Sequence, residues 1–289
     1  MIRTINAWLN WLILLTPRWL PALLLVPVLY LIGWIKAKTL TLFGLPADAV
    51  SLVGTLFSFL MFVVLMPRWV RLRWHRSSPW QTLGLRSSTS SRSSGTASFL
   101  KGLLWAGLLL TLVVVPLVLG HWVQWQGQGS WRLVADALLL LFGVGLAEEL
   151  IFRGWLWEEL NQLLGPRTGM ISQALIFSLV HTRFNLGLWP MLGLLTGLFL
   201  LGLVLALRRR LDHGSLWGCI GLHGGLVSGW FLLDQGLFEL SVDAPAWLTG
   251  PGGNQPNPLG GAIGISALAL LYWHERRLNR RTPPVIENP

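Results

Sequence analysis

Residues 145–153 read Gly-Leu-Ala-Glu-Glu-Leu-Ile-Phe-Arg and put two adjacent carboxylates, Glu148 and Glu149, inside a segment otherwise apolar enough to span a bilayer. A charged side chain at mid-bilayer costs roughly 2.5 to 3.5 kcal/mol on insertion scales, so ionisable residues there usually carry a function. Arg153 lies one helical turn after Glu149, and this i, i+4 spacing predicts an ion pair that offsets the burial of both groups. Glu148 points about 100° away from Glu149, which leaves it free to face a cavity.

The composition predicts an all-α, polytopic membrane helical bundle. Hydrophobic residues make up 53% of the chain and charged residues 12%, and the mean hydropathy is +0.58. A membrane span needs about 20 apolar residues to cross a core about 30 Å thick. We expect about eight transmembrane helices, centred near residues 26, 58, 110, 143, 175, 197, 225 and 267.

The basic residues indicate orientation rather than a nucleic-acid partner, although the net charge is +10. They gather in residues 68–101, at Arg208–Arg210 and in residues 276–281, which lie on one side of the membrane if there are eight spans. The opposite connections, residues 121–131 and 234–259, contain no Lys or Arg. We therefore expect an integral protein of a bacterial plasma membrane with both termini cytoplasmic, a topology that Lys36 and Lys38 do not fit.

The chain is expected to have four parts. Residues 1–85 hold an N-terminal interfacial helix and two membrane spans, and residues 86–98 are a Ser-rich cytoplasmic linker. Residues 99–275 form a six-span membrane domain, followed by a basic cytoplasmic tail at residues 276–289. Residues 241–259 contain too much Pro and Gly for a helix, and the single Cys219 is expected to be a buried, unreactive thiol.

Helix geometry predicts that His181 reaches the depth of Glu148. Residues 164–167, Leu-Gly-Pro-Arg, are a helix-stop and turn signal, so the flanking segments should form an antiparallel pair. Glu148 and His181 stand almost equally far from that turn along the chain, about 25 Å at 1.5 Å per residue. His223 follows a turn near residues 210–214 and also reaches the interior, at a less well matched depth.

A carboxylate and two imidazoles suit hydrolysis, because they can hold a divalent metal or polarise water directly. The alternative is a satisfied polar network that only fixes helix packing. Glu158 and Glu159 lie nearer the turn and are expected to be solvated interfacial charges. Arg183 and Asn185 are expected to have interfacial or packing roles.

These motifs resemble the CPBP intramembrane proteases, also called the Abi or CAAX protease family, which includes the type II CAAX prenyl endopeptidase. The family pattern is Glu-Glu-x-x-x-Arg, then Phe-x-x-x-His, then His-x-x-x-Asn or Asp, on three spans. The first element matches at residues 148–153, the second at Phe177 and His181, and the third begins at His223. Val227 stands where the family often has Asn or Asp. The resemblance covers roughly residues 133 to 235.

The resemblance implies catalytic roles for three residues. Glu148 would activate water with the help of His181, and His223 would bind the oxyanion or a metal. Supporting roles fall to Glu149, Arg153 and Phe177. Since the family has been described both as metal-dependent and as glutamate proteases, Zn²⁺ held by Glu148, His181 and His223 stays an alternative to metal-free chemistry. Val227 can neither ligate a metal nor donate a hydrogen bond, which weakens the oxyanion role.

We therefore expect an intramembrane endopeptidase that acts on membrane-associated protein or peptide substrates and has the lipid bilayer, not nucleic acid, as its other partner. A non-proteolytic membrane scaffold or maturation factor that keeps the protease fold is the alternative that Val227 favours. A proton-coupled transporter is a third possibility, because Glu and His also build proton relays. The sequence has no inverted repeat and no paired broken spans to support it.

Overall fold

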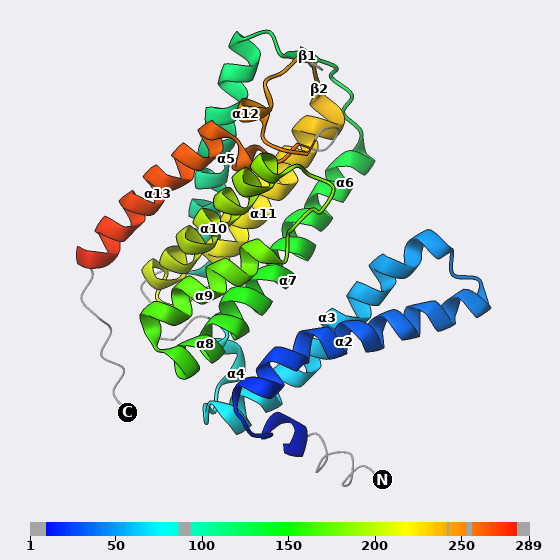
Figure 1. The fold of residues 1–289 in the computed structure, drawn as a ribbon, viewed down its shortest axis with the longest axis vertical. Coiled ribbons are helices and arrows are strands. Elements are labelled where there is room, and N and C mark those ends of the chain that lie inside the picture. The colour runs from blue at the N-terminus through cyan, green and yellow to red at the C-terminus, as the bar shows by residue number, and fades with distance from the viewer. Residues whose placement is uncertain (1–9, 87–93, 242, 253–255, 282–289) are drawn as a thin grey trace. The chain divides into compact units, whose positions relative to one another are not determined.

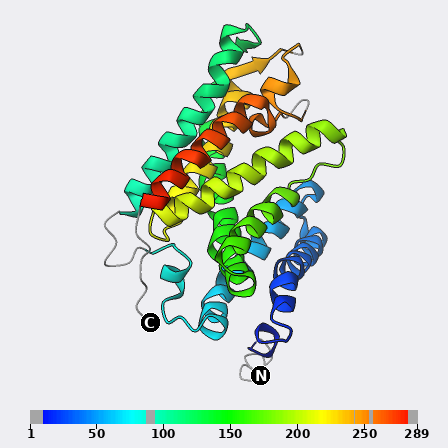
Figure 2. The same ribbon diagram turned by 60° about the vertical axis from the view of Figure 1, so that its left-hand side comes forward.

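The computed structural model describes residues 10–86, 94–241, 243–252 and 256–281. Its contacts divide the chain into two compact units, Met1–Thr82 and Leu83–Pro289. Each unit is helical, and the helices are seen in Figures 1 and 2.

The first unit is a helical hairpin of α2 (Trp19–Leu40) and α3 (Val50–Arg73), followed by the short α4 (Pro79–Thr82). The chain reverses after α2 at Gly44, whose positive φ of 96° favours glycine. Gly33 allows the two helices to approach closely, since a Cβ there would lie 2.4 Å from the Gly54 carbonyl oxygen. Small residues at such crossings are typical of helices that associate in membranes.

Arg73 fastens the chain before α2 to the end of α3. Its guanidinium is buried and donates to the carbonyl oxygens of Ile13 at 2.9 Å and Arg18 at 2.8 Å. Of the predicted interfacial helix at residues 1–17, residues 1–9 lie outside the described part of the chain, and residues 10–13 are helical.

The second unit carries the sequence motifs. Its helices in chain order are α5 (Gly95–Leu119), α6 (Trp131–Leu139), α7 (Gly145–Glu149), α8 (Trp157–Leu164), α9 (Pro166–Leu179), α10 (Leu188–Leu211), α11 (Trp217–Leu232), α12 (Ala246–Thr249) and α13 (Ala262–Arg281). Of the predicted linker at residues 86–98, residues 87–93 lie outside the described residues, and α5 already begins within the remainder. In the predicted tail, α13 continues to residue 281, and residues 282–289 are not described.

Helices α6, α7 and α8 join into one long helix through two π-helical segments, Leu140–Val144 and Leu150–Leu156 (Figure 1). The side chain of Ser130 caps its start by accepting from the backbone N–H of Leu133 at 3.1 Å. The helix stops at Gly165, whose φ of +83° few other residues adopt, and α9 then starts with a proline at its first position. Helices α8 and α9 pack against each other. The predicted turn and helix pair are therefore confirmed.

Helix α11 is central in this unit and packs against α5, α7 and α10. A shared apolar core joins α5, α9, α10, α11 and α13; its fully buried members include Phe177, Leu201, Val204, Cys219, Leu222 and Leu268. Cys219 is buried as expected and donates its thiol to the Leu205 carbonyl oxygen at 3.2 Å.

One end of the unit holds two short antiparallel strands, β1 (Val123–Trp125) and β2 (Phe238–Leu240), with Gln124 opposite Glu239 in register (Figure 2). The fold is thus nearly all-α, as expected, with two short strands that the sequence did not predict. The expectation that residues 241–259 form no helix was wrong, because α12 and a 3₁₀ turn at Pro258–Gly260 lie there.

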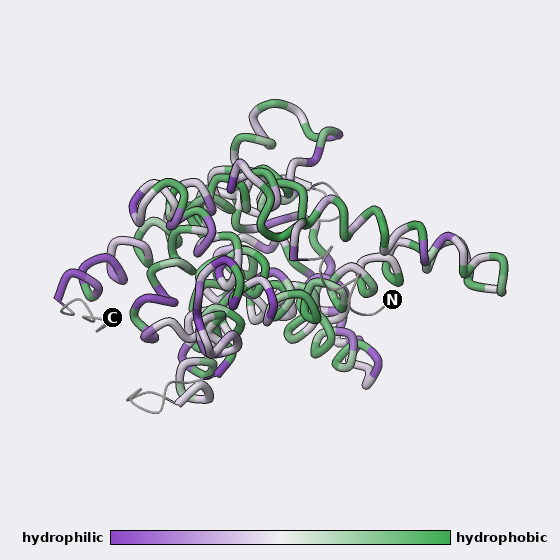
Figure 3. The backbone as a smooth tube through the Cα atoms, turned by 90° about the horizontal axis from the view of Figure 1, so that it is seen from below, coloured by the Kyte–Doolittle hydropathy of each residue, from purple (hydrophilic) through white to green (hydrophobic). Residues whose placement is uncertain are grey.

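Every expected span centre lies in a helix, but the expected number of spans is not established. Within the described residues, 4 helices are long and apolar enough to cross a membrane: Trp19–Phe43, Ala47–Arg73, Gly95–Leu119 and Leu188–Leu211. Helix α9 has 14 residues, about 21 Å at 1.5 Å per residue, which is shorter than a bilayer core. Figure 3 shows the apolar character of most helices and the polar end of α13 near the C terminus.

Candidate active site

The two adjacent carboxylates lie at the end of α7, between the two π-helical segments. A π-helix widens the turn from i, i+4 to i, i+5 hydrogen bonding and is found frequently at functional sites. A regular α-helix was expected here from the sequence, and neither π-helical segment was predicted. The only local signal is a glycine inside each, Gly143 and Gly154.

Glu149 is fully buried and joins two partners through one oxygen. Its Oε1 accepts from Arg153 Nη1 at 2.8 Å and lies 2.8 Å from His223 Nδ1. The Arg153 guanidinium is also fully buried and stacks over the ring of Phe177 at 4.0 Å. The predicted Glu149–Arg153 ion pair is confirmed, and the pair additionally fixes an imidazole from α11.

Glu148 faces the two histidines. Its Oε2 lies 3.5 Å from His181 Nε2 and 3.9 Å from His223 Nε2. The Glu148 side chain is 27% exposed and that of His181 is 33% exposed, whereas His223 is buried. Among the described residues, the buried Oε2 atom has no hydrogen-bond partner. The expected meeting of Glu148 with His181 is confirmed, and His223 reaches the same point.

Phe177 on α9 holds both imidazoles in place. His181 lies in the turn after α9, and its Nδ1 is 2.7 Å from the Phe177 carbonyl oxygen. The fully buried Phe177 ring contacts the His181 ring at 4.9 Å and the His223 ring at 5.6 Å between centroids. One aromatic side chain therefore packs against both histidines and against the arginine of the ion pair.

These contacts assign the ring protons. A carbonyl oxygen only accepts, so His181 Nδ1 must carry a hydrogen and donate to Phe177. Glu149 Oε1, which already accepts from Arg153, likewise receives the Nδ1 hydrogen of His223. Both neutral imidazoles then present the lone pair of Nε2 toward Glu148. Three acceptor atoms face one another, and a water molecule or a proton satisfies such an arrangement.

Glycines set the close crossing of α7 and α11. A Cβ on Gly145 would lie 3.0 Å from the Gly224 Cα, and one on Gly224 would lie 2.3 Å from the Leu141 carbonyl oxygen. Since Gly224 directly follows His223, this contact brings the imidazole to the carboxylates. The role of these glycines was not predicted from the sequence, although close helix approach through small residues is common in membranes.

The remaining predicted residues lie farther from this chemistry. Glu159 is buried, 2% exposed, so the expectation of a solvated charge was wrong for it. Glu158 accepts from Gln162 Nε2 at 3.2 Å at the surface. Asn185 is exposed, and Val227 is half-buried one turn after His223.

The arginines at the end of α10 do more than the orientation signal predicted from sequence. Arg208 is buried and donates to both carboxylate oxygens of Asp212 and to Glu275 Oε1, each at 3.0 Å. Arg209 is also buried, and its Nη1 donates to the backbone carbonyl of Arg153. Both guanidinium groups therefore form hydrogen bonds inside the helix bundle.

A zinc site at Glu148, His181 and His223 was a sequence expectation. In the described part of the chain, no three His, Cys, Asp or Glu side chains are arranged so that they could hold a metal ion. Glu148 Oε2 and the two Nε2 atoms, at 3.5 and 3.9 Å, can also act on water directly, without a metal. Zinc dependence stays a prediction for chelation to test.

Two family models match the chain. Residues 130–228 match the family described as type II CAAX prenyl endopeptidase Rce1-like, and residues 3–78 match a domain of unknown function, DUF8676. No curated protein and no solved structure matches. The first match contains all of the clustered residues Glu148, His181 and His223. With its long apolar helices, the chain is an integral membrane protein, and its residues 130–228 form a domain of the CPBP, or CAAX protease, family.

Proposed function

We propose that this protein is an intramembrane endopeptidase that hydrolyses peptide bonds of membrane-associated substrates with water activated by Glu148 and His181. One observation carries the proposal: Glu148 Oε2 lies 3.5 Å from one Nε2 and 3.9 Å from the other, while both Nδ1 atoms are engaged elsewhere. The Rce1-like match adds that the family acts as membrane proteases.

The first step is the attack of water on the scissile carbonyl carbon. A water molecule held between Glu148 Oε2 and His181 Nε2 donates a hydrogen bond to either acceptor. As its oxygen bonds to the carbonyl carbon, one of its protons passes to Glu148, and the carbonyl π electrons move to the oxygen. General-base assistance of this kind contributes typically 10²- to 10⁴-fold in rate.

The resulting oxyanion needs a donor. The proton that can satisfy the three facing acceptor atoms, when it is held on His223 Nε2 before water attacks, lets Nε2 donate to the oxyanion while Glu149 accepts the Nδ1 hydrogen and stabilises the positive ring. This proton stays on His223 through the step. Glu148 then gives its proton to the nitrogen of the leaving amine, the C–N bond breaks, and the carboxylate is restored. Arg153 Nη1 donates to the same Glu149 oxygen.

The test is digestion of a membrane-peptide library by the purified protein, comparing the wild type with Glu148→Gln. The variant removes the base and preserves shape, so we expect a loss of cleavage of at least about 100-fold with unchanged thermal unfolding. Cleavage at the wild-type rate would contradict the proposal. Parallel reactions with a chelator and with added zinc separate metal-dependent from glutamate chemistry.

A non-proteolytic scaffold or maturation factor is the second candidate. Val227 favours it, because this position offers no hydrogen bond one turn after His223, where the resembling family often has Asn or Asp. If the wild type cleaves nothing under any of these conditions, the scaffold becomes the better account.

A further inference from the structure

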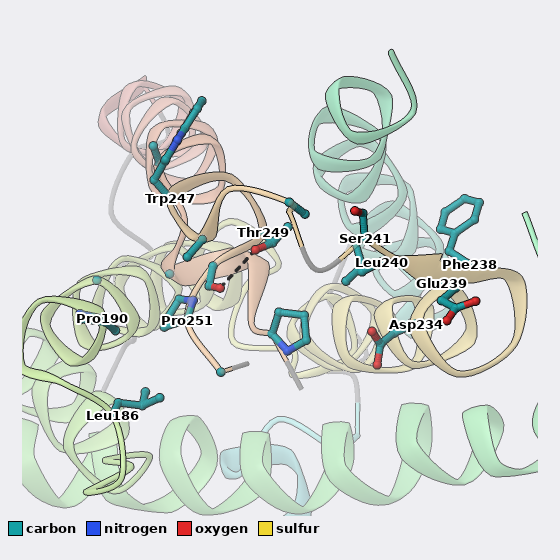
Figure 4. Close-up of a pocket in the computed structure, with 18 of the residues that line it drawn as sticks. Leu186, Pro190, Asp234, Phe238, Glu239, Leu240, Ser241, Trp247, Thr249 and Pro251 are labelled. Atoms are coloured by element: carbon teal, nitrogen blue, oxygen red, sulfur yellow. Dashed lines mark hydrogen bonds between the residues drawn. The ribbon is translucent and has the colours of Figure 1, made fainter. Parts of the chain in front are cut away.

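A second candidate binding region lies away from the carboxylate–histidine cluster. A cavity of about 1190 Å³ is lined by residues from β2, α12, the start of α10 and the π-helical segment Leu233–Leu237 that continues α11 (Figure 4). Neither Glu148 nor the two histidines of the cluster line it. It can therefore bind a ligand without occupying the proposed catalytic residues.

The described lining of the cavity contains two acidic side chains and no basic one. Asp234 and Glu239 line it, and no Lys, Arg or His is among its described lining residues. Each carboxylate has a neutral amide partner: Asp234 Oδ2 accepts from Gln235 Nε2, and Glu239 Oε2 from Gln126 Nε2, both at 2.6 Å. Two like charges in a concave, partly apolar space favour a cationic occupant.

The opposite wall is apolar. Figure 4 shows Leu186, Pro190 and Pro251 across the cavity from the two carboxylates. Trp189 and Trp247 also belong to the lining and are 79% and 63% exposed. Exposed indole rings provide both apolar surface and a face for a cation. An occupant with positive and apolar side chains in one segment matches both walls.

The cavity lies within reach of a substrate bound at the cluster. Asp234 follows His223 on one continuous helix, about 11 residues later and so about 16 Å farther along its axis. Leu186, on the other wall, lies in the loop between α9 and α10 that also contains His181. An extended peptide covers about 16 Å with roughly five residues.

We propose that this cavity binds the positively charged segment of a membrane-anchored peptide substrate, about five residues from the bond that is cleaved. The inference rests on the proposed protease function for the identity of the occupant. It makes the cavity a specificity site that selects substrates with Lys or Arg beside apolar residues.

Binding is measured first, independently of cleavage. Full-length Glu148→Gln protein in phosphatidylcholine nanodiscs is titrated against two fluorescein-labelled heptapeptides, one alternating Lys with Leu and the other Gln with Leu. We expect the Lys peptide to bind at least about fivefold more tightly, since two partly exposed ion pairs each contribute modestly. Raising the salt from about 0.05 M to about 0.5 M should remove the difference.

Paired variants assign the effect to the cavity. The double change Asp234→Asn, Glu239→Gln should abolish the preference for Lys, whereas Asp243→Asn, an exposed acid outside the lining, should retain it. Equal binding of both peptides by the parent protein, or an unchanged preference in the double variant, would overturn the inference. Empty nanodiscs provide the baseline for binding to lipid.

Cleavage separates this inference from the proposed function. Lys is scanned along a peptide that the wild type cleaves, and kcat/KM should peak when Lys stands about five residues from the cleaved bond. If the wild type cleaves nothing while the charge preference persists, the protease proposal fails and the cavity remains a cation-binding site. If cleavage occurs without any charge preference, only the cavity inference fails.

Discussion

The Glu149–Arg153 pair and the Arg208–Asp212 pair have the same local design. In each, an arginine and a carboxylate four residues apart are buried and hydrogen-bonded, at 2.8 Å in the first and 3.0 Å in the second. Each pair also binds a group on another helix, an imidazole on α11 in the first and a carboxylate on α13 in the second. Burial of charge is therefore common to both.

The two clusters differ in what lies beyond the pair. From Glu149 the contacts lead through His223 to Glu148, a partly exposed carboxylate with two imidazole nitrogens facing it. From Arg208 they end at Glu275, which is fully buried. The comparison teaches that a buried ion pair alone indicates packing, whereas free imidazole nitrogens around an accessible carboxylate indicate chemistry.

The strongest test of this distinction is Arg153→Met. Removing the guanidinium leaves Glu149 without its cation in a buried position, which should cost about 3 to 5 kcal/mol of unfolding free energy. Cleavage per folded molecule should also fall, because the carboxylate that orients His223 then lacks its partner. Thermal unfolding measures the loss of stability. The cleavage rate divided by the concentration of folded protein measures the loss of activity. Loss of stability with normal activity would make Arg153 a purely structural residue.

Arg208→Met is the matched change in the other cluster. It leaves Asp212 and Glu275 buried without a cation, so a destabilisation of similar size, about 3 to 5 kcal/mol, is expected. Activity per folded molecule should stay within about twofold of the wild type. A selective fall in kcat at unchanged folded fraction would break the comparison, since both clusters would then support catalysis.

The smallest effect is expected at the helix crossing. Gly145→Ala puts a methyl group 3.0 Å from the Gly224 backbone, and overpacking of this kind typically costs about 1 to 3 kcal/mol. It should also reduce activity by moving His223 away from Glu148. Gly143→Ala is the control, because nothing lies within 4 Å of its added methyl. If the two variants have the same unfolding free energy and the same cleavage rate, the close crossing of α7 and α11 does not position His223.

The sequence was sufficient for the parts of the site that depend on helix periodicity. The Glu149–Arg153 pair followed from i, i+4 spacing, and the meeting of Glu148 with His181 followed from the stop at Gly165 and equal arm lengths. Their catalytic roles stay predictions. The count of about eight spans also stays open, because within the described residues helix length and composition support four of them.

Contacts between distant segments were not predictable in the same way. A single glycine inside each π-helical segment is too weak a signal to predict it, and nothing near Glu275 indicates that Arg208 reaches it from α10. Glu159 was expected to be a solvated charge because it lies near the turn, yet tertiary packing buries it. The β1–β2 pair joins segments more than about 100 residues apart, each too short to be recognised as a strand.

The central claim is tested most directly by the rate of peptide cleavage per folded molecule for two matched amide changes, Glu148→Gln and Glu275→Gln. Both replace a carboxylate by its isostere, and Glu275→Gln keeps an oxygen that can accept from Arg208. The account predicts that Glu148→Gln loses at least about 100-fold and that Glu275→Gln cleaves at close to the wild-type rate. Wild-type cleavage by Glu148→Gln, or an equal loss in both variants, would contradict it.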